Sequence, residues 1–223
     1  MKPEGGFGGA SFTPPTAHVT RAIVAVCVVV QIVATLGGAG VADTIAGHAA
    51  LIPARVAGFV PPRAGDIPAG LTLLTSLFLH AGWVHLALNL TFLWWVGRNV
   101  EIEVGRARFV LLYALGGLVG GLFQVAVAPH SIAPVVGASG AIASVFGTYA
   151  VLFARSRAKA RRVLGITISA AFATAVWYAA AWIGLQLLTA VAFNNGEGGI
   201  AIWTHIGGFI VGLIFAQPFV RRG

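Results

Sequence analysis

Charged residues are scarce in this chain of 223 residues. Asp, Glu, Lys and Arg together make up 9% of it, whereas 58% of the residues are hydrophobic and the mean hydropathy is +0.90. A soluble globule of this length needs far more polar surface than this composition supplies. The scarcity of charge therefore excludes a soluble domain and indicates an integral membrane protein.

Acidic residues and cysteine are rarer still. Six Asp and Glu stand against 14 Lys and Arg, and the one cysteine is Cys27, so no disulfide bond can form within the chain. A net charge of +8 would suit nucleic acid, but the basic residues stand in short stretches between apolar runs. We interpret them as topology signals, and no nucleic acid is expected as a partner.

Apolar runs fill most of the chain. A membrane span needs about 20 apolar residues, and we count six spans, roughly 20–40, 83–100, 107–128, 139–155, 163–189 and 202–219. The sequence therefore predicts an all-α membrane protein, a bundle of six transmembrane helices forming a single domain over residues 20–219. Residues 1–19 are expected to form a short cytoplasmic tail and residues 220–223 a basic cytoplasmic C-terminus.

The stretch from 41 to 82 is apolar but is not expected to span. It is rich in Gly, Pro and Ala, and prolines interrupt it at positions 53, 61, 62 and 68. Proline breaks a helix interior because it lacks an N–H and clashes with the preceding turn. This stretch is predicted to be a structured loop, partly embedded in the membrane interface between the first two helices.

The distribution of Lys and Arg predicts the orientation. With a cytoplasmic N-terminus, 12 of the 14 basic residues fall on the inner side and only Arg55 and Arg63 fall outside. Basic residues concentrate on the cytoplasmic side of membrane proteins. Both termini are therefore predicted to lie inside, and the second, fourth and sixth spans all run from outside to inside.

Two short motifs open the fourth and sixth spans, and each holds a residue suited to catalysis. Ser139 lies 16 residues before Arg155, and His205 lies 16 residues before Arg221. At 1.5 Å per residue, both stand about 24 Å above the inner basic boundary. The two side chains are therefore predicted at the same depth, near the outer side of the hydrocarbon core.

Small residues on these two spans favour a close approach of the helices. The fourth span has Ser139, Ala143 and Gly147 at four-residue spacing, and the sixth has Gly208 and Gly212. Helices in lipid pack closely where such residues face one another. We expect these two faces to meet.

A serine beside a neutral histidine suits acyl transfer, because the imidazole can take the hydroxyl proton and later protonate the leaving amine. The Ser139 N–H, next to Ala138, lies at a helix N-terminus where amides are unsatisfied and negative charge is favoured. Glu101 and Glu103 fall on the inner side, and Glu197 is weighed only as an unfavoured third member. The sequence thus predicts a Ser139–His205 dyad rather than a triad.

His85 and Asn89 lie one turn apart on the second span, on one helical face. Imidazole and amide groups inside a membrane require partners or a substrate, so both are candidate oxyanion donors. His80 is unassigned, either structural or near the mouth of the cavity. No pair of histidines shows metal-ligand spacing beside a carboxylate, so neither a metal nor a cofactor is expected.

These motifs together resemble those of the rhomboid intramembrane serine proteases. The resemblance covers roughly residues 71–219 and rests on three elements in the family's order: His85-x-x-x-Asn89 followed by Asn99-Val100-Glu101, then Gly137-Ala138-Ser139-Gly140, then Thr204-His205-Ile206-Gly207-Gly208. It implies hydrolysis of peptide bonds in or beside transmembrane segments of membrane-protein substrates. The implied roles are Ser139 and His205 for catalysis, with His85, Asn89, Ala138 and the Ser139 amide at the oxyanion and Gly137, Gly140 and Gly208 in support.

This sequence departs from the family pattern at two places. Members often carry a Trp-Arg pair in the first outer loop, and residues 68–79 lack it. Some members place an aromatic residue four positions after the serine, where this chain has Ala143. We therefore expect the bracing of the loop and the orientation of His205 to differ here.

Two other classes of function stay open beside the protease. One is a catalytically silent rhomboid-like scaffold or chaperone that binds membrane helices, although such relatives typically lack the serine or the histidine. The other is a small transporter, for which intramembrane charges or an internal repeat would be expected. The expected partners are substrate transmembrane segments and the lipid bilayer, and the expected location is a bacterial inner membrane. Span five and the glycine-rich loop 194–199 are candidate gating elements, while the substrate, the cleavage site and the oligomeric state are not indicated.

Overall fold

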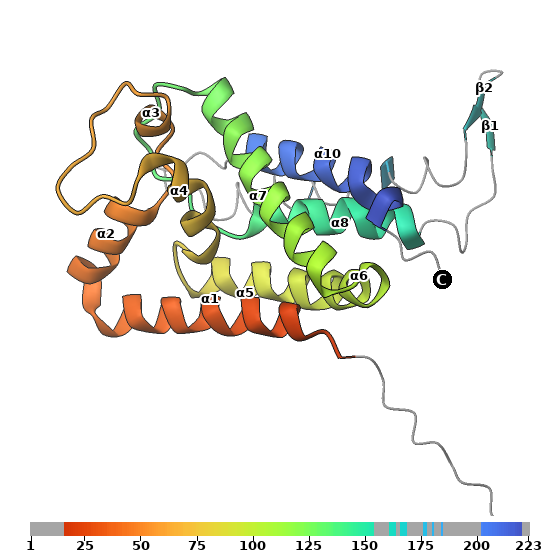
Figure 1. Ribbon diagram of the computed structural model, residues 1–223, viewed down its shortest axis with the longest axis horizontal. Helices are drawn as coiled ribbons and strands as arrows, with labels where there is room; N and C mark the ends of the chain where they lie inside the picture. Colours follow the sequence, from red (N-terminus) through yellow and green to blue (C-terminus); the bar gives the residue numbers. More distant parts are fainter. Residues whose placement is uncertain are drawn as a thin grey trace, which may run out of the picture.

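A computed structural model describes residues 16–153, 161–163, 166–168, 176–177, 180, 184 and 202–219. Within these ranges the chain is mostly helical (Figure 1). The helices are α1 (His18–Leu36), α2 (Gly38–Ala49), α3 (Pro53–Val56), α4 (Ala69–Thr75), the 3-10 helix η1 (Ser76–Phe78), α5 (Trp83–Phe92), the π-helical stretch η2 (Leu93–Gly97), α6 (Arg98–Val104), α7 (Arg106–Val127), α8 (Ser139–Phe153) and α10 (Ile202–Phe219).

Three of these helices, α1, α7 and α10, are long and apolar enough to cross a membrane. A fourth candidate is the bent pair Ala69–Phe78 and Trp83–Val104, whose two parts meet at 83°. α8 is apolar, and its described residues, Ser139–Phe153, number 15, about 22 Å of helix. The described residues thus hold up to four candidate spans of the six that the sequence predicts.

The stretch from 41 to 82, predicted as a loop, contains four short helices. α2 turns away from the end of α1 at Gly37 and Gly38, where Gly38 has a φ of +78° (Figure 1). Pro53 is the first residue of α3, and Pro68 directly precedes α4. Proline is tolerated in the first turn because the N–H it lacks has no helical partner there. The prolines therefore start helices in this region as well as interrupting them.

Two short strands correct the expectation of a purely helical chain. β1 (Arg161–Val163) pairs antiparallel with β2 (Ile166–Ile168). Four of the six strand residues, Val163, Ile166, Thr167 and Ile168, are β-branched, and such residues favour extended backbone. Residues 163 and 166–168 were predicted to begin the fifth span, so its start is wrong; most of 169–189 lies outside the described residues.

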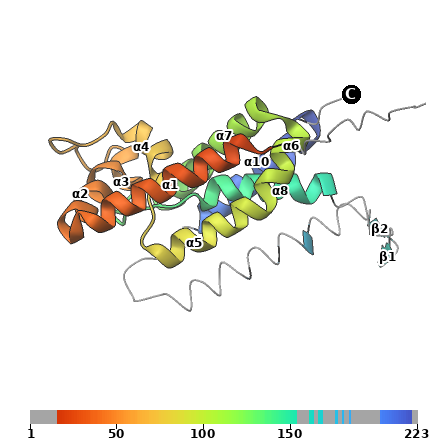
Figure 2. The same cartoon turned by 90° about the horizontal axis from the view of Figure 1, so that it is seen from below.

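Glycines bring α7, α8 and α10 close together. A Cβ on Gly116 would overlap the side chain of Ser144, and one on Gly120 would overlap the carbonyl oxygen of Thr204. Gly117 and Gly121, on another face of α7, lie against Leu77 and Leu73. Figure 2, turned by 90° from Figure 1, again shows α10 beside α7 and α8. These contacts leave no room for a side chain where the helices cross.

The side chain of Glu101, in α6, connects this helix to the start of α1 through hydrogen bonds. Its carboxylate accepts hydrogen bonds from Val19 N (2.9 Å), Thr20 N (2.8 Å) and Thr20 Oγ1 (2.7 Å), and the residue is 2% exposed. The first amides of a helix have no intrahelical acceptor, and a carboxylate there is favoured by the helix dipole. Glu101 is therefore a capping residue supplied from 81 residues away.

Candidate active site

Ser139 is the first residue of α8, and the backbone before it is strongly bent. Gly137 has a φ of +120°, which favours glycine. Ala138 is fully buried, and its carbonyl accepts the N–H of Ile142 at 2.8 Å, so the helix begins here. Because the first four amides of a helix lack intrahelical acceptors, the Ser139 N–H is oriented to donate to a group outside the helix.

His205 meets this serine from α10. Its Nε2 lies 2.8 Å from Ser139 Oγ, and the residue is 6% exposed. In the tautomer with a proton on Nδ1, Nε2 accepts the hydroxyl proton, which is the geometry of a base poised beside a nucleophile. The sequence motifs thus lead to two side chains in direct contact, 66 positions apart in the chain.

The glycines of α10 face α8 as expected, but the small residues they meet on α8 are shifted. A Cβ on Gly208 would overlap the carbonyl oxygen of Gly140, and one on Gly212 would overlap that of Ser144. Gly147 lies against Phe209 and Gly212. Ser139 meets α10 through His205, whereas the atoms closest to Gly208 and Gly212 belong to the backbone of Gly140 and Ser144. Successive side chains of a helix point in directions about 100° apart. A four-residue spacing therefore does not by itself decide which of two neighbouring rows of residues faces the other helix.

His85, in α5, lies against Gly137 in the segment that precedes Ser139. A Cβ on Gly137 would be 2.8 Å from His85 Cε1 and 2.9 Å from Nε2, and 3.8 Å from Asn89 Nδ2. Asn89 donates one N–H to the carbonyl of His85 at 3.0 Å, and its amide has a second N–H. His85 and Asn89 therefore lie against Gly137, two residues before Ser139.

His80 lies in the bend between η1 and α5 and contacts His85. The two ring centroids are 5.2 Å apart in an edge-to-face arrangement. Both ring nitrogens of His80 are buried. His80 therefore packs beside His85, a placement that fits both predicted roles, a structural residue and one near the mouth of the cavity.

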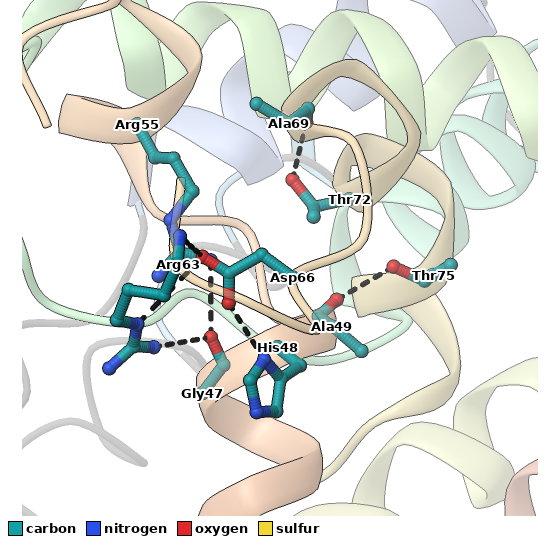
Figure 3. Close-up of polar contacts among 9 residues, drawn as sticks. All are labelled: Gly47, His48, Ala49, Arg55, Arg63, Asp66, Ala69, Thr72 and Thr75. Atoms are coloured by element: carbon teal, nitrogen blue, oxygen red, sulfur yellow. Dashed lines mark hydrogen bonds and ion pairs between the residues drawn. The ribbon is translucent and has the colours of Figure 1, made fainter. Parts of the chain in front are cut away.

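Four side chains brace the segment 47–66, which is predicted to lie in the outer loop (Figure 3). Asp66 accepts hydrogen bonds from His48 Nδ1 (2.8 Å) and Arg63 N (2.7 Å), and forms an ion pair with Arg55 Nη1 (3.3 Å). Arg55 Nη1 and Arg63 Nη2 also donate to the carbonyl of Gly47, at 3.1 and 2.9 Å. We call Asp66, Arg55, Arg63 and His48 the outer-loop cluster.

The electrostatics of this cluster favour the ionised carboxylate. The backbone N–H of Arg63, the His48 ring and the charges of Arg55 and Arg63 lower the pKa of Asp66, and together they outweigh the opposing effect of desolvation. The cluster is not among the sites predicted from the sequence. Its signal is that Arg55 and Arg63, the two basic residues predicted outside, precede Asp66 in one short segment.

Several sequence predictions fall outside the described residues. They concern Glu197, the loop 194–199 and most of span five. Among the described residues, no group of three His, Cys, Asp or Glu side chains is arranged to hold a metal ion.

Comparison with known proteins identifies related sequences. The family model of the Rhomboid domain matches residues 69–222. The chain is 38% identical over 96 residues to Rhomboid protease GluP of Bacillus subtilis, an alignment that covers 43% of this chain and 18% of that protein. RHOMBOID-like protein 4 of Arabidopsis thaliana is 32% identical over 157 residues, covering 69% of this chain and 35% of the relative. A third relative, Inactive rhomboid protein 1 of Drosophila melanogaster, is 34% identical over 94 residues, 41% of this chain and 7% of its own length. The chain thus spans well under two thirds of these relatives.

Proposed function

Because the chain belongs to the rhomboid family of membrane proteins, we propose that it is an intramembrane serine endopeptidase that cleaves membrane-protein substrates in or beside their transmembrane segments. One contact carries the proposal, the 2.8 Å between Ser139 Oγ and His205 Nε2. Two relatives named as rhomboid proteases, including GluP, support it.

The proposed reaction begins with attack of Ser139 Oγ on the carbonyl carbon of the scissile peptide bond. His205 Nε2 accepts the hydroxyl proton, and the carbonyl oxygen becomes an oxyanion. The Ser139 N–H, the Asn89 amide and the His85 ring donate hydrogen bonds to that oxyanion, with Gly137 and Ala138 shaping the backbone around it.

Collapse of the tetrahedral intermediate breaks the C–N bond, and His205 gives its proton to the leaving amine. The product is an ester between Ser139 and the N-terminal part of the substrate. His205 then takes a proton from water, the hydroxide attacks the ester carbonyl, and the proton returns to Ser139 as the acid product leaves. The proposed mechanism uses Ser139 and His205 alone and needs no carboxylate beside them.

Cleavage by the purified protein tests the proposal. In detergent or liposomes the wild type should cut a membrane-helix substrate, and Ser139→Ala should lower kcat by at least roughly 10³-fold because the nucleophile is lost. A fluorophosphonate probe should label the wild type and fail to label His205→Ala. Ser144→Ala is the matched control, because Ser144 lies on the same helix with its hydroxyl bonded to the Leu112 carbonyl at 3.0 Å.

The competing function is a catalytically silent protein that binds membrane helices as a scaffold or chaperone. The relative named Inactive rhomboid protein 1 favours it. Under this alternative the wild type would neither cleave nor react with the probe, while Ser139→Ala would bind a transmembrane peptide as tightly as the wild type. Cleavage that persists in Ser139→Ala would contradict the dyad itself.

The proposal includes six transmembrane helices over residues 20–219, with the tails 1–19 and 220–223 on the cytoplasmic side. It is supported by the placement of 12 of 14 basic residues on one side. A cysteine at Ala64, in a Cys27→Ser background, should react with a membrane-impermeant maleimide in intact cells. A cysteine appended after Gly223 should react only after lysis, and the reverse pattern would contradict the orientation. The relatives include plant proteins and a mitochondrial protein of yeast as well as bacterial ones, so a bacterial inner membrane remains a proposal.

A further inference from the structure

The outer loop and the loop before Ser139 are joined by backbone hydrogen bonds. Leu51 and Val135 exchange two of them, at 3.1 and 2.8 Å, in an isolated antiparallel bridge. Ala54 N donates to Ser131 O at 2.9 Å. Residues 51–54 therefore fix the position of residues 131–135.

That fixed segment leads directly into the active site. Two residues after Val135, the N–H of Gly137 donates to the carbonyl of Ser76 at 2.9 Å, while Gly137 packs against His85. Ser139 follows two residues later. With so few residues between the bridge and the nucleophile, a displacement at Leu51 is passed to the backbone that lines the oxyanion position.

Residues 51–54 are held in turn by the outer-loop cluster. Arg55, in α3, is 6% exposed, and its guanidinium lies between Asp66 and the carbonyl of Gly47. The Asp66 side chain is 1% exposed (Figure 3). A buried guanidinium that loses its carboxylate carries an uncompensated charge, which is strongly destabilising. We therefore expect that loss of Asp66 would move α3 and Arg55 toward water, where the guanidinium is solvated.

We propose that Asp66 is a positioning residue for catalysis, which acts through Arg55, α3 and the Leu51–Val135 bridge to hold the loop 131–138 against His85. The inference rests on the proposed protease function for its effect on rate. The hydrogen-bonded route from Asp66 to Gly137 is independent of that function, and this separates the two experiments that follow.

Hydrogen exchange tests the route without requiring activity. In Asp66→Asn, the amides of Val135 and Gly137 should exchange at least roughly tenfold faster than in the wild type, because the bridge opens more often. Amides in the middle of α7 should keep their rates. Asp43→Asn is the matched control, since Asp43 is an exposed aspartate of the adjacent helix α2. Unchanged exchange at Val135 and Gly137 would overturn the inference, and so would uniform acceleration that includes α7.

Steady-state kinetics test the effect of Asp66 on the rate of cleavage. Asp66→Asn should lower kcat by roughly tenfold and leave KM within about twofold, because misplacement of catalytic groups affects the reaction more than binding. Val135→Pro removes the N–H that bonds to Leu51 and should lower kcat in the same way. If Asp66 acts through the bridge, the double variant is no slower than Val135→Pro alone.

Two kinetic outcomes contradict the inference. Effects of Asp66→Asn and Val135→Pro that multiply would show that Asp66 acts by another route, and an active wild type whose kcat is insensitive to Asp66→Asn would show that it does not act at all. A wild type that neither cleaves nor reacts with fluorophosphonate would contradict the proposed function instead, and the exchange experiment would still decide the inference.

Discussion

Gly137 and the imidazole of His85 are in direct contact, so close that a Cβ on Gly137 would lie 2.8 Å from His85 Cε1. The contact joins the segment before Ser139 to α5 at the place where the proposed mechanism puts the oxyanion. It also requires glycine for a second reason, because the φ of Gly137 is +120°.

Gly137→Ala should therefore impair catalysis more than folding. The added methyl group pushes His85 away and strains the backbone, and we expect kcat to fall by roughly 10²-fold. Cleavage assays and the rate of fluorophosphonate labelling measure this effect. Gly40→Ala is the control, since Gly40 has open space around it. Wild-type labelling of Gly137→Ala would show that His85 is not needed at this distance.

Gly212→Ala should destabilise the bundle. A Cβ there would overlap the Ser144 carbonyl oxygen, so α8 and α10 must separate, at a cost of about 1–3 kcal/mol. The midpoint of thermal unfolding in detergent should fall, again relative to Gly40→Ala. A variant as stable as the wild type would mean that these helices are not closely packed at Gly212.

Glu101→Gln should loosen the start of α1. The neutral amide loses the charge-assisted bonds from Val19 and Thr20, and we expect a loss of about 1–3 kcal/mol. Glu103, an exposed residue two positions on, provides the matched control in Glu103→Gln. Equal unfolding midpoints for the two variants would contradict the capping role.

The outer-loop cluster should be sensitive to acid. The pKa of Asp66 in the folded protein is below its usual value of 3.8, so the carboxylate contributes stability that is present above pH 3.8 and is lost as the pH falls through the folded pKa. Hydrogen exchange of the Arg63 and Asp66 amides should therefore be slower in the wild type than in Asp66→Asn at pH 6. The difference should shrink below about pH 4, and one that persists well below that pH would contradict the assignment.

Much of the fold was predictable because apolar runs and helix starts are local features. The runs at 107–128 and 202–219 correspond closely to α7 and α10. The short helices within the segment 41–82 could not be predicted, because proline is compatible with both a loop and the first turn of a helix, and packing decides between them. The start of the fifth span failed for a similar reason, since β-branched residues occur in both strands and membrane helices.

The sequence by itself determined that the chain belongs in a membrane, which residues are suited to catalysis and that Ser139 and His205 lie at matching distances from basic boundaries. These follow from composition, residue chemistry and helical rise, which do not depend on distant contacts. Only the tertiary structure decided that the backbone of Gly140 and Ser144 contacts the glycines of α10, and that Asp66 pairs with Arg55. Such pairings depend on the exact rotation of each helix and on which segments meet across the fold, and residue spacing within one element does not determine either.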